Sequence, residues 1–199
     1  MPIICRMFEL PAESAKKLTG AANLPDAIKS AKNHFDVYRY WHAIEYLLAQ
    51  HVPESPSARW LSLGDTVSSA AGAIPAARLI PSSEVAGLHQ LLQSIEPEQL
   101  IPYYDAATLD GAAVYPGTWL EWEETFDPLG QVLEHYSFLR EFVGKRASAA
   151  DAFCFILYSL MTARSDNALQ RTRAVGRGCN PRVRHHVGVA IKASRGRRR

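Results

Sequence analysis

The sequence has few cysteines and no long apolar run. Its 199 residues include three cysteines, at positions 5, 154 and 179, whose wide spacing indicates neither a disulfide framework nor a zinc site. The longest uncharged apolar stretch, residues 152–161, is about half as long as a membrane-spanning helix requires. Residues 1–5 lack the basic region and the apolar core of a secretory signal. We therefore expect a cytoplasmic protein that does not enter the membrane.

Recognisable catalytic and cofactor motifs are also missing. No serine lies in a Gly-x-Ser-x-Gly turn, and no Gly-x-x-x-x-Gly-Lys phosphate loop or dinucleotide fingerprint occurs. Cys154 lies inside an apolar run, where a thiol is usually inert packing. The motifs therefore indicate no cofactor, no metal ligand and no catalytic residue, and they leave enzyme activity open.

Acidic residues are almost missing from the last fifth of the chain. Residues 161–199 hold 11 Lys or Arg and a single acid, Asp166, whereas residues 1–160 hold 11 bases and 19 acids. The net charges are therefore +10 and −8. Large apolar residues are also scarce after Met161, so this segment cannot bury enough surface to offset the entropy of ordering it. We predict an acidic domain over residues 1–161 and a basic, disordered tail over residues 162–199.

Hydrophobic periodicity indicates helices and a few strands within the first domain. Residues 3–10 are apolar and end at Pro11, as expected of a first strand. Apolar residues recur at helical spacing in segments 35–49, 85–95 and 129–143, and residues 59–64 are expected to form a short strand or turn. The apolar run at 152–158 is typical of a strand covered on both faces. The pattern predicts a single compact α+β domain with a mixed sheet of few strands covered by helices. A three-layer α/β sandwich is the alternative.

Several modest motifs occur together in a familiar order. They are Met-Pro-Ile-Ile-Cys at 1–5, Asp-Val-Tyr-Arg-Tyr-Trp-His-Ala-Ile-Glu-Tyr-Leu-Leu at 36–48, Ala-Arg-Leu-Ile-Pro-Ser-Ser-Glu-Val at 77–85, Tyr-Asp-Ala-Ala-Thr-Leu at 104–109 and Ala-Val-Tyr-Pro at 113–116. Over residues 1–160 the chain resembles the YfbM-like family, small bacterial proteins catalogued as a domain of unknown function. The resemblance implies a compact α/β-type domain in a bacterial cytoplasm, and it implies no activity. Relatives carry histidine where Glu45 stands here, and the basic tail has no counterpart in the family pattern.

Two groups of residues are candidates for ligand contact. His42 and Glu45 lie three residues apart on the predicted helix 35–49, beside Trp41, and such a pair can supply two metal ligands or a base with its orienting acid. The alternative is an ordinary surface ion pair, with Trp41 in the core. Segment 115–124 combines Tyr115, Trp119 and Glu121 with further carboxylates, which suits a cationic or sugar-like ligand. It is otherwise a surface loop pinned by a tryptophan.

Three functional hypotheses follow. The first is a non-catalytic module that binds a small molecule or a protein. The second is a hydrolase or metal-dependent enzyme built on His42, Glu45 and segment 115–124. The third is weak, non-specific nucleic-acid contact through the arginines of the tail, which carries no aromatic residue for stacking on bases. The tail has a further interpretation, as a read-through or out-of-frame ending, and the partners are unknown.

Overall fold

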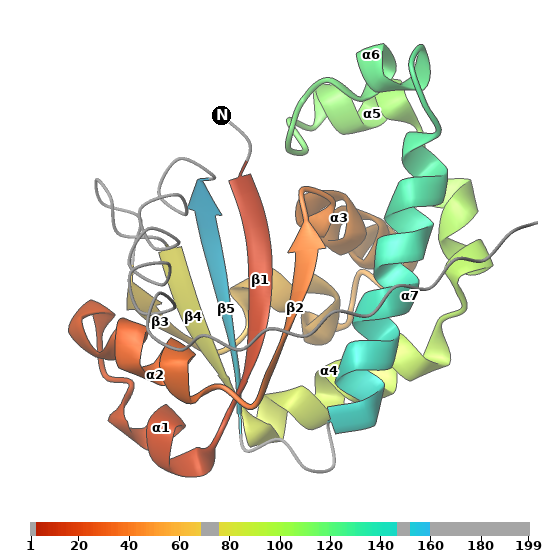
Figure 1. Cartoon of the computed structure of the whole chain (residues 1–199). Helices are drawn as coiled ribbons and strands as arrows, with labels where there is room; N and C mark the ends of the chain where they lie inside the picture. The colour runs from red at the N-terminus through yellow and green to blue at the C-terminus, as the bar shows by residue number, and fades with distance from the viewer. Residues whose placement is uncertain (1–2, 69–75, 147–151, 160–199) are drawn as a thin grey trace, which may run out of the picture.

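A five-stranded antiparallel sheet forms the centre of the protein (Figure 1). The computed structural model describes residues 3–68, 76–146 and 152–159. The elements in chain order are β1 (Ile3–Leu10), α1 (Ala12–Lys17), η1 (Ala21–Asn23), α2 (Leu24–Ser30), β2 (Asn33–Tyr38), α3 (Trp41–His51), η2 (Pro56–Ser62), β3 (Asp65–Ser68), β4 (Ala76–Pro81), α4 (Ser82–Ser94), η3 (Pro97–Tyr103), α5 (Ala106–Gly111), α6 (Trp119–Glu123), α7 (Pro128–Arg146) and β5 (Ala152–Ser159).

The strand order is β2-β1-β5-β4-β3. The last strand, β5, lies between β1 and β4 and runs antiparallel to both. The other edge of β1 pairs with β2, so that Cys5 of β1 pairs with Leu157 of β5 on one side and with Tyr38 of β2 on the other. Among the described residues every strand pair is antiparallel, so the sheet is purely antiparallel and does not combine parallel and antiparallel pairs, as the expected mixed sheet would. The expected strands at 3–10 and 152–158 are confirmed.

Both faces of the sheet are covered, because alternate residues of a strand point to opposite sides. The larger core lies between the sheet and α3, α4 and α7, and the smaller core lies between the sheet and the α1–α2 side (Figure 1). Within β5, Phe153 belongs to the first core and Cys154 and Ile156 belong to the second. The α+β class is confirmed, as is the prediction that the last strand is covered on both faces. The helices form two layers around an antiparallel sheet.

The boundaries of the helix expected at 35–49 differ in the structure. Residues 33–38 form β2, and the helix begins at Trp41. Val37 fits the helical spacing with Trp41, Ile44 and Leu48, yet it also fits the alternation of a strand. The pairing of residues 33–38 with β1 favours the strand over the helix. Arg6 of β1 holds Asp36 of β2 through an ion pair of 2.5 Å. Residues 59–64 were expected to form a strand or turn, but residues up to Ser62 belong to the 3-10 helix η2.

The other two predicted helices are confirmed as α4 and α7. The helix α7 begins after Asp127, whose Oδ1 accepts the Gly130 N–H at 2.8 Å. Among the described helices, none combines the length and the apolarity that crossing a bilayer would require. The predicted boundary at residue 161 and the tail 162–199 lie outside the described residues.

Candidate functional site

Three of the predicted contact residues meet where α3 begins. The Trp41 ring stacks with the His42 ring, with centroids 5.1 Å apart, and with the Tyr115 ring, with centroids 5.4 Å apart. Nδ1 of His42 accepts the backbone N–H of Tyr115 at 2.9 Å, so the neutral imidazole carries its proton on Nε2. This cluster brings together residues 73 positions apart in the sequence.

The same cluster is fixed to the first strand. The Tyr115 hydroxyl accepts the Ile3 N–H at 2.5 Å, and the Trp41 indole N–H donates to the Ile3 carbonyl at 3.3 Å. Burial lowers the pKa of His42, which favours the neutral ring that the Tyr115 contact requires. The Trp41 indole N–H, His42 Nδ1 and the Tyr115 hydroxyl therefore bind other parts of the chain and join α3, β1 and the α5–α6 connection.

Glu45 is directed to a different neighbour. Its Oε2 accepts the Leu61 N–H at 2.6 Å, on the helix η2. Burial raises the pKa of this carboxyl, and the Leu61 hydrogen bond and the Arg59 charge oppose that rise. The hydrogen bonds of His42 and Glu45 thus run to separate segments, and the geometry does not favour the base-and-acid arrangement considered from their spacing.

Segment 115–124 is divided between the core and the surface. Trp119 is fully buried, its indole N–H donates to the Val114 carbonyl at 2.9 Å, and its backbone N–H donates to Asp110 Oδ1 at 2.8 Å. The Asp110 carboxylate therefore satisfies the first amide of α6, as an acid at a helix N-terminus does. Glu121 lies exposed on the same short helix. Within the ranges that the structure covers, no group of three or more His, Cys, Asp or Glu side chains is placed to hold a metal ion.

A second aromatic cluster, which the sequence analysis did not identify, lies on the surface of β2, α6 and α7. We call it the aromatic patch and define it as Tyr38, Tyr40, Trp122, Phe126, His135 and Phe138. Its rings form a continuous series with centroids 4.6–6.3 Å apart, in which His135 contacts Tyr38, Tyr40 and Phe138. Trp122 connects Tyr40 to Phe126. Tyr40 is the buried floor of the patch, and burial raises the pKa of its hydroxyl.

The patch leaves large apolar side chains in contact with water. Tyr38, Phe126 and Phe138 are 45%, 39% and 46% exposed. A groove of about 220 Å³ continues from Phe138 between β2 and α7, and its lining residues are Phe35, Phe138, Glu141, Phe142 and Lys145. One signal in the sequence could have indicated this surface: Phe138 lies outside the apolar stripe of its helix, four positions before Phe142 at the flank of that stripe.

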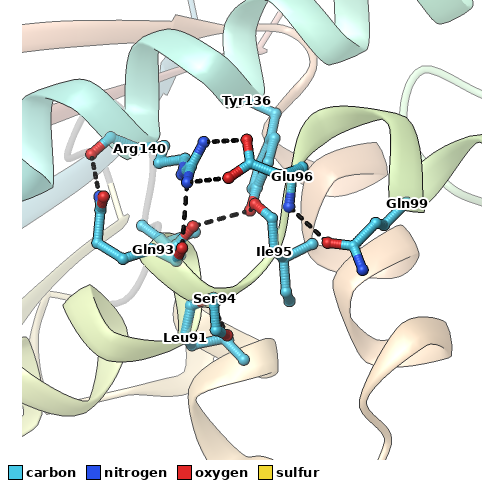
Figure 2. A network of polar contacts seen from close by, with 9 residues as sticks. Leu91, Gln93, Ser94, Ile95, Glu96, Gln99, Tyr136 and Arg140 are labelled. Carbon is cyan, nitrogen blue, oxygen red and sulfur yellow. Dashed lines mark hydrogen bonds and ion pairs between the residues drawn. The ribbon is translucent and has the colours of Figure 1, made fainter.

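The side of α7 facing α4 and η3 is fixed by a polar network (Figure 2). The Arg140 guanidinium donates to both carboxylate oxygens of Glu96 at 2.6 Å and to the Gln93 carbonyl at 3.1 Å. The Tyr136 hydroxyl lies within hydrogen-bond distance of the Leu92 and Ile95 carbonyls, at 3.2 and 2.9 Å. Arg140 lowers the pKa of Glu96, mainly through these hydrogen bonds. The network joins α7, which carries His135 and Phe138 of the patch, to the C-terminal end of α4 and the start of η3.

Comparison with known proteins agrees with this architecture. The family model described as "Domain of unknown function (DUF1877)" matches residues 1–156. The crystal structure of YfbM from Escherichia coli, a protein of unknown function, is similar with a TM-score of 0.57 and 16% identity, over 78% of this chain and 99% of that one. At this identity the likeness concerns the fold. No curated protein matches the chain significantly. With more than half of its length matched by the family model, the chain belongs to the DUF1877 family, and the resemblance to YfbM-like proteins is confirmed.

Proposed function

We propose that this protein is a non-catalytic protein-binding module and that the aromatic patch is its binding surface. The observation that carries the proposal is the exposure of Tyr38, Phe126 and Phe138 within one continuous series of ring contacts. Contiguous exposed apolar surface is uncommon on monomeric proteins and marks interaction sites. Aromatic residues are also enriched where proteins bind one another.

The dimensions of the groove favour a protein over a small molecule as the occupant. At about 220 Å³ it is smaller than the 300–1,000 Å³, roughly, of sites that enclose a small-molecule ligand. Shallow grooves of this kind accept one side chain of a partner while the surrounding surface makes the remaining contacts. The hydrogen bonds of His42 Nδ1 and Glu45 Oε2 to backbone amides of separate segments support structural roles for these two atoms.

Site-specific photo-cross-linking tests the proposal. A photoreactive phenylalanine analogue replaces Phe138 in the full chain, and in a matched protein it replaces Ile101, which is 43% exposed on η3. The two proteins are produced in cells of the organism from which the sequence comes, and the cells are irradiated. We expect a discrete protein adduct from position 138 and no such adduct from position 101. Equal adducts from both positions, or none from 138, would contradict the proposal.

A further inference from the structure

The chemistry of the surface around the patch indicates which kind of partner it fits, provided that the proposed binding function holds. Along α7, the exposed residues Glu134, Phe138, Glu141 and Lys145 are spaced by four, three and four positions. Residues at these spacings lie on one helix face. Phe138 is therefore flanked on that face by two carboxylates.

Negative charge predominates over the whole α6–α7 region. Between residues 119 and 145 there are two bases and six acids, which are Glu121, Glu123, Glu124, Asp127, Glu134 and Glu141, giving a net charge of −4 with His135 neutral. Both bases are engaged: Arg140 binds Glu96 (Figure 2), and Lys145 binds Glu141. All six acids are exposed, so the surface carries a negative potential that attracts cationic groups.

The patch already holds one cation from its own chain. The Arg39 guanidinium carbon lies 4.7 Å from the centre of the Trp122 ring. At this distance the ring face attracts a guanidinium. The groove beside Phe138 supplies the apolar part of the surface, because Phe35 and Phe142 stack there with centroids 5.6 Å apart.

We propose that the partner is a basic segment of another protein in which arginine or lysine residues alternate with apolar or aromatic ones. An apolar side chain of this segment enters the groove beside Phe138. Its cationic side chains lie against Glu134, the acids of α6 and the aromatic rings. Charge complementarity gives specificity and fast association, and burial of the apolar side chain supplies affinity.

The test uses a fluorescein-labelled probe, the peptide Arg-Phe-Arg-Leu-Arg-Phe-Arg, and fluorescence anisotropy with the full 199-residue chain. Two further probes separate charge from apolar contact: one has glutamate in place of each arginine, and the other has serine in place of each apolar residue. We expect the first probe to bind, the glutamate probe not to bind, and the serine probe to bind about tenfold more weakly because it leaves the groove empty.

Variants locate the binding. Phe138→Ser should weaken binding of the first probe about tenfold, and the double change Glu134→Gln/Glu141→Gln should weaken it about fivefold, as expected for exposed charges. The matched controls Ile101→Ser and Glu13→Gln, on other surfaces, should leave the affinity unchanged. Equal binding of the arginine and glutamate probes, or equal losses in the control variants, would overturn the proposal.

The cross-linking experiment separates the two proposals. An adduct from position 138 together with failure of the arginine probe overturns the basic partner and leaves the binding module standing. Absence of both adduct and probe binding overturns both. An adduct with a second copy, or with residues 162–199 of the same chain identified by mass spectrometry, assigns the surface to that occupant and overturns the basic partner.

Discussion

His42 contributes to the fold through an unprotonated ring nitrogen. Its Nδ1 accepts the Tyr115 N–H, and in the imidazolium form that nitrogen would carry a proton and lose the contact. The free energy of folding therefore depends on the protonation state of His42. Burial lowers the pKa of His42 in the folded state below its value in the unfolded chain.

Stability should consequently fall as the pH decreases through the histidine range. As the pH falls, the unfolded chain binds a proton on His42 at about pH 6.5, whereas the folded chain binds it only at a lower pH. The contribution of His42 to the free energy of unfolding is therefore complete above this pH and is lost below it. We expect urea midpoints to decrease between about pH 7 and pH 5.5. Changing His42→Asn keeps an acceptor for Tyr115 without a titratable ring, and this variant should show a flatter pH profile in the same window.

His42→Phe removes the acceptor and leaves the Tyr115 N–H without its present partner. We expect this change to lower the free energy of unfolding by about 1 kcal/mol at pH 8, where His42 of the wild type is neutral. The measurement is urea unfolding followed by tryptophan fluorescence. If His42→Phe and wild type unfold at the same urea concentration, His42 does not join the two segments.

The sequence predicted parts of this cluster and could not predict its partners. His42 was a candidate because it lies three residues from Glu45 on a predicted helix, and Trp41 and Tyr115 were candidates because aromatic rings can contact a ligand. The donor for His42 is a backbone amide 73 residues away, and no pattern of side chains shows where a backbone amide will lie. Glu45 illustrates the same limit, because its partner is the Leu61 amide. Ligand contact by the candidate residues Trp41, His42, Glu45 and Tyr115 stays a prediction.

At the scale of elements, Tyr136 connects α7 to the end of α4. Its one hydroxyl proton is shared between the Ile95 carbonyl at 2.9 Å (Figure 2) and the Leu92 carbonyl at 3.2 Å, and the side chain is fully buried. We expect Tyr136→Phe to destabilise the protein by about 1 to 2 kcal/mol, because buried carbonyls lose their donor while the ring packing is kept. The matched control is Tyr103→Phe, at a side chain that is exposed. Equal urea midpoints for Tyr136→Phe and Tyr103→Phe would contradict this role.

Gly64 marks the point where the chain passes close to β4 before β3 begins. Its φ is +68°, and a Cβ there would lie 2.0 Å from the Leu79 carbonyl oxygen. We expect Gly64→Ala to cost about 3 kcal/mol, because the backbone must shift and the left-handed conformation is strained for alanine. Gly20→Ala is the control, since Gly20 has extended backbone and open space at the Cβ position. Thermal unfolding should separate these two variants clearly.

Element prediction from the sequence succeeded where one periodicity applied. The helices α4 and α7 have such patterns, and the first and last strands were predicted as short apolar runs. Residues 35–49 satisfied both periods, since Phe35 and Val37 alternate with polar neighbours while Val37 also begins a helical stripe. Pairing between β2 and β1 decided the outcome, and that contact is not local in sequence.

At the scale of the whole molecule, the division of charge leads to a prediction about the boundary. We propose that residues 1–161 fold without the basic segment, because the family model ends at residue 156 and β5 completes the centre of the sheet at Ser159. A chain ending at residue 161 should have the melting temperature of the full chain in buffer of physiological salt. A clear decrease would show that the basic segment contributes to the folded core.

The sequence predicted the class of this fold and not the aromatic patch that we propose as a binding surface. The periodicity of apolar residues and the length of apolar runs are local properties, and they indicated α+β. The aromatic patch combines residues from 38 to 138, and it exists only because β2, α6 and α7 meet. An aromatic residue is usually assigned to the core, and Trp119 and Tyr136 follow that rule, whereas Phe138 does not.

The central claim is that the exposed rings of the aromatic patch, Tyr38, Phe126 and Phe138, serve binding and contribute little to folding, whereas Tyr40 belongs to the core. Its most direct test places the photoreactive analogue at Tyr38 and measures adduct yield and melting temperature with and without the double change Phe126→Ser/Phe138→Ser. The account predicts that the yield falls about tenfold while the melting temperature changes by at most about 2 °C, because both phenylalanines lie at the surface, 39% and 46% exposed, and outside the buried core. An unchanged yield, or a loss of yield that merely follows unfolding, would contradict it.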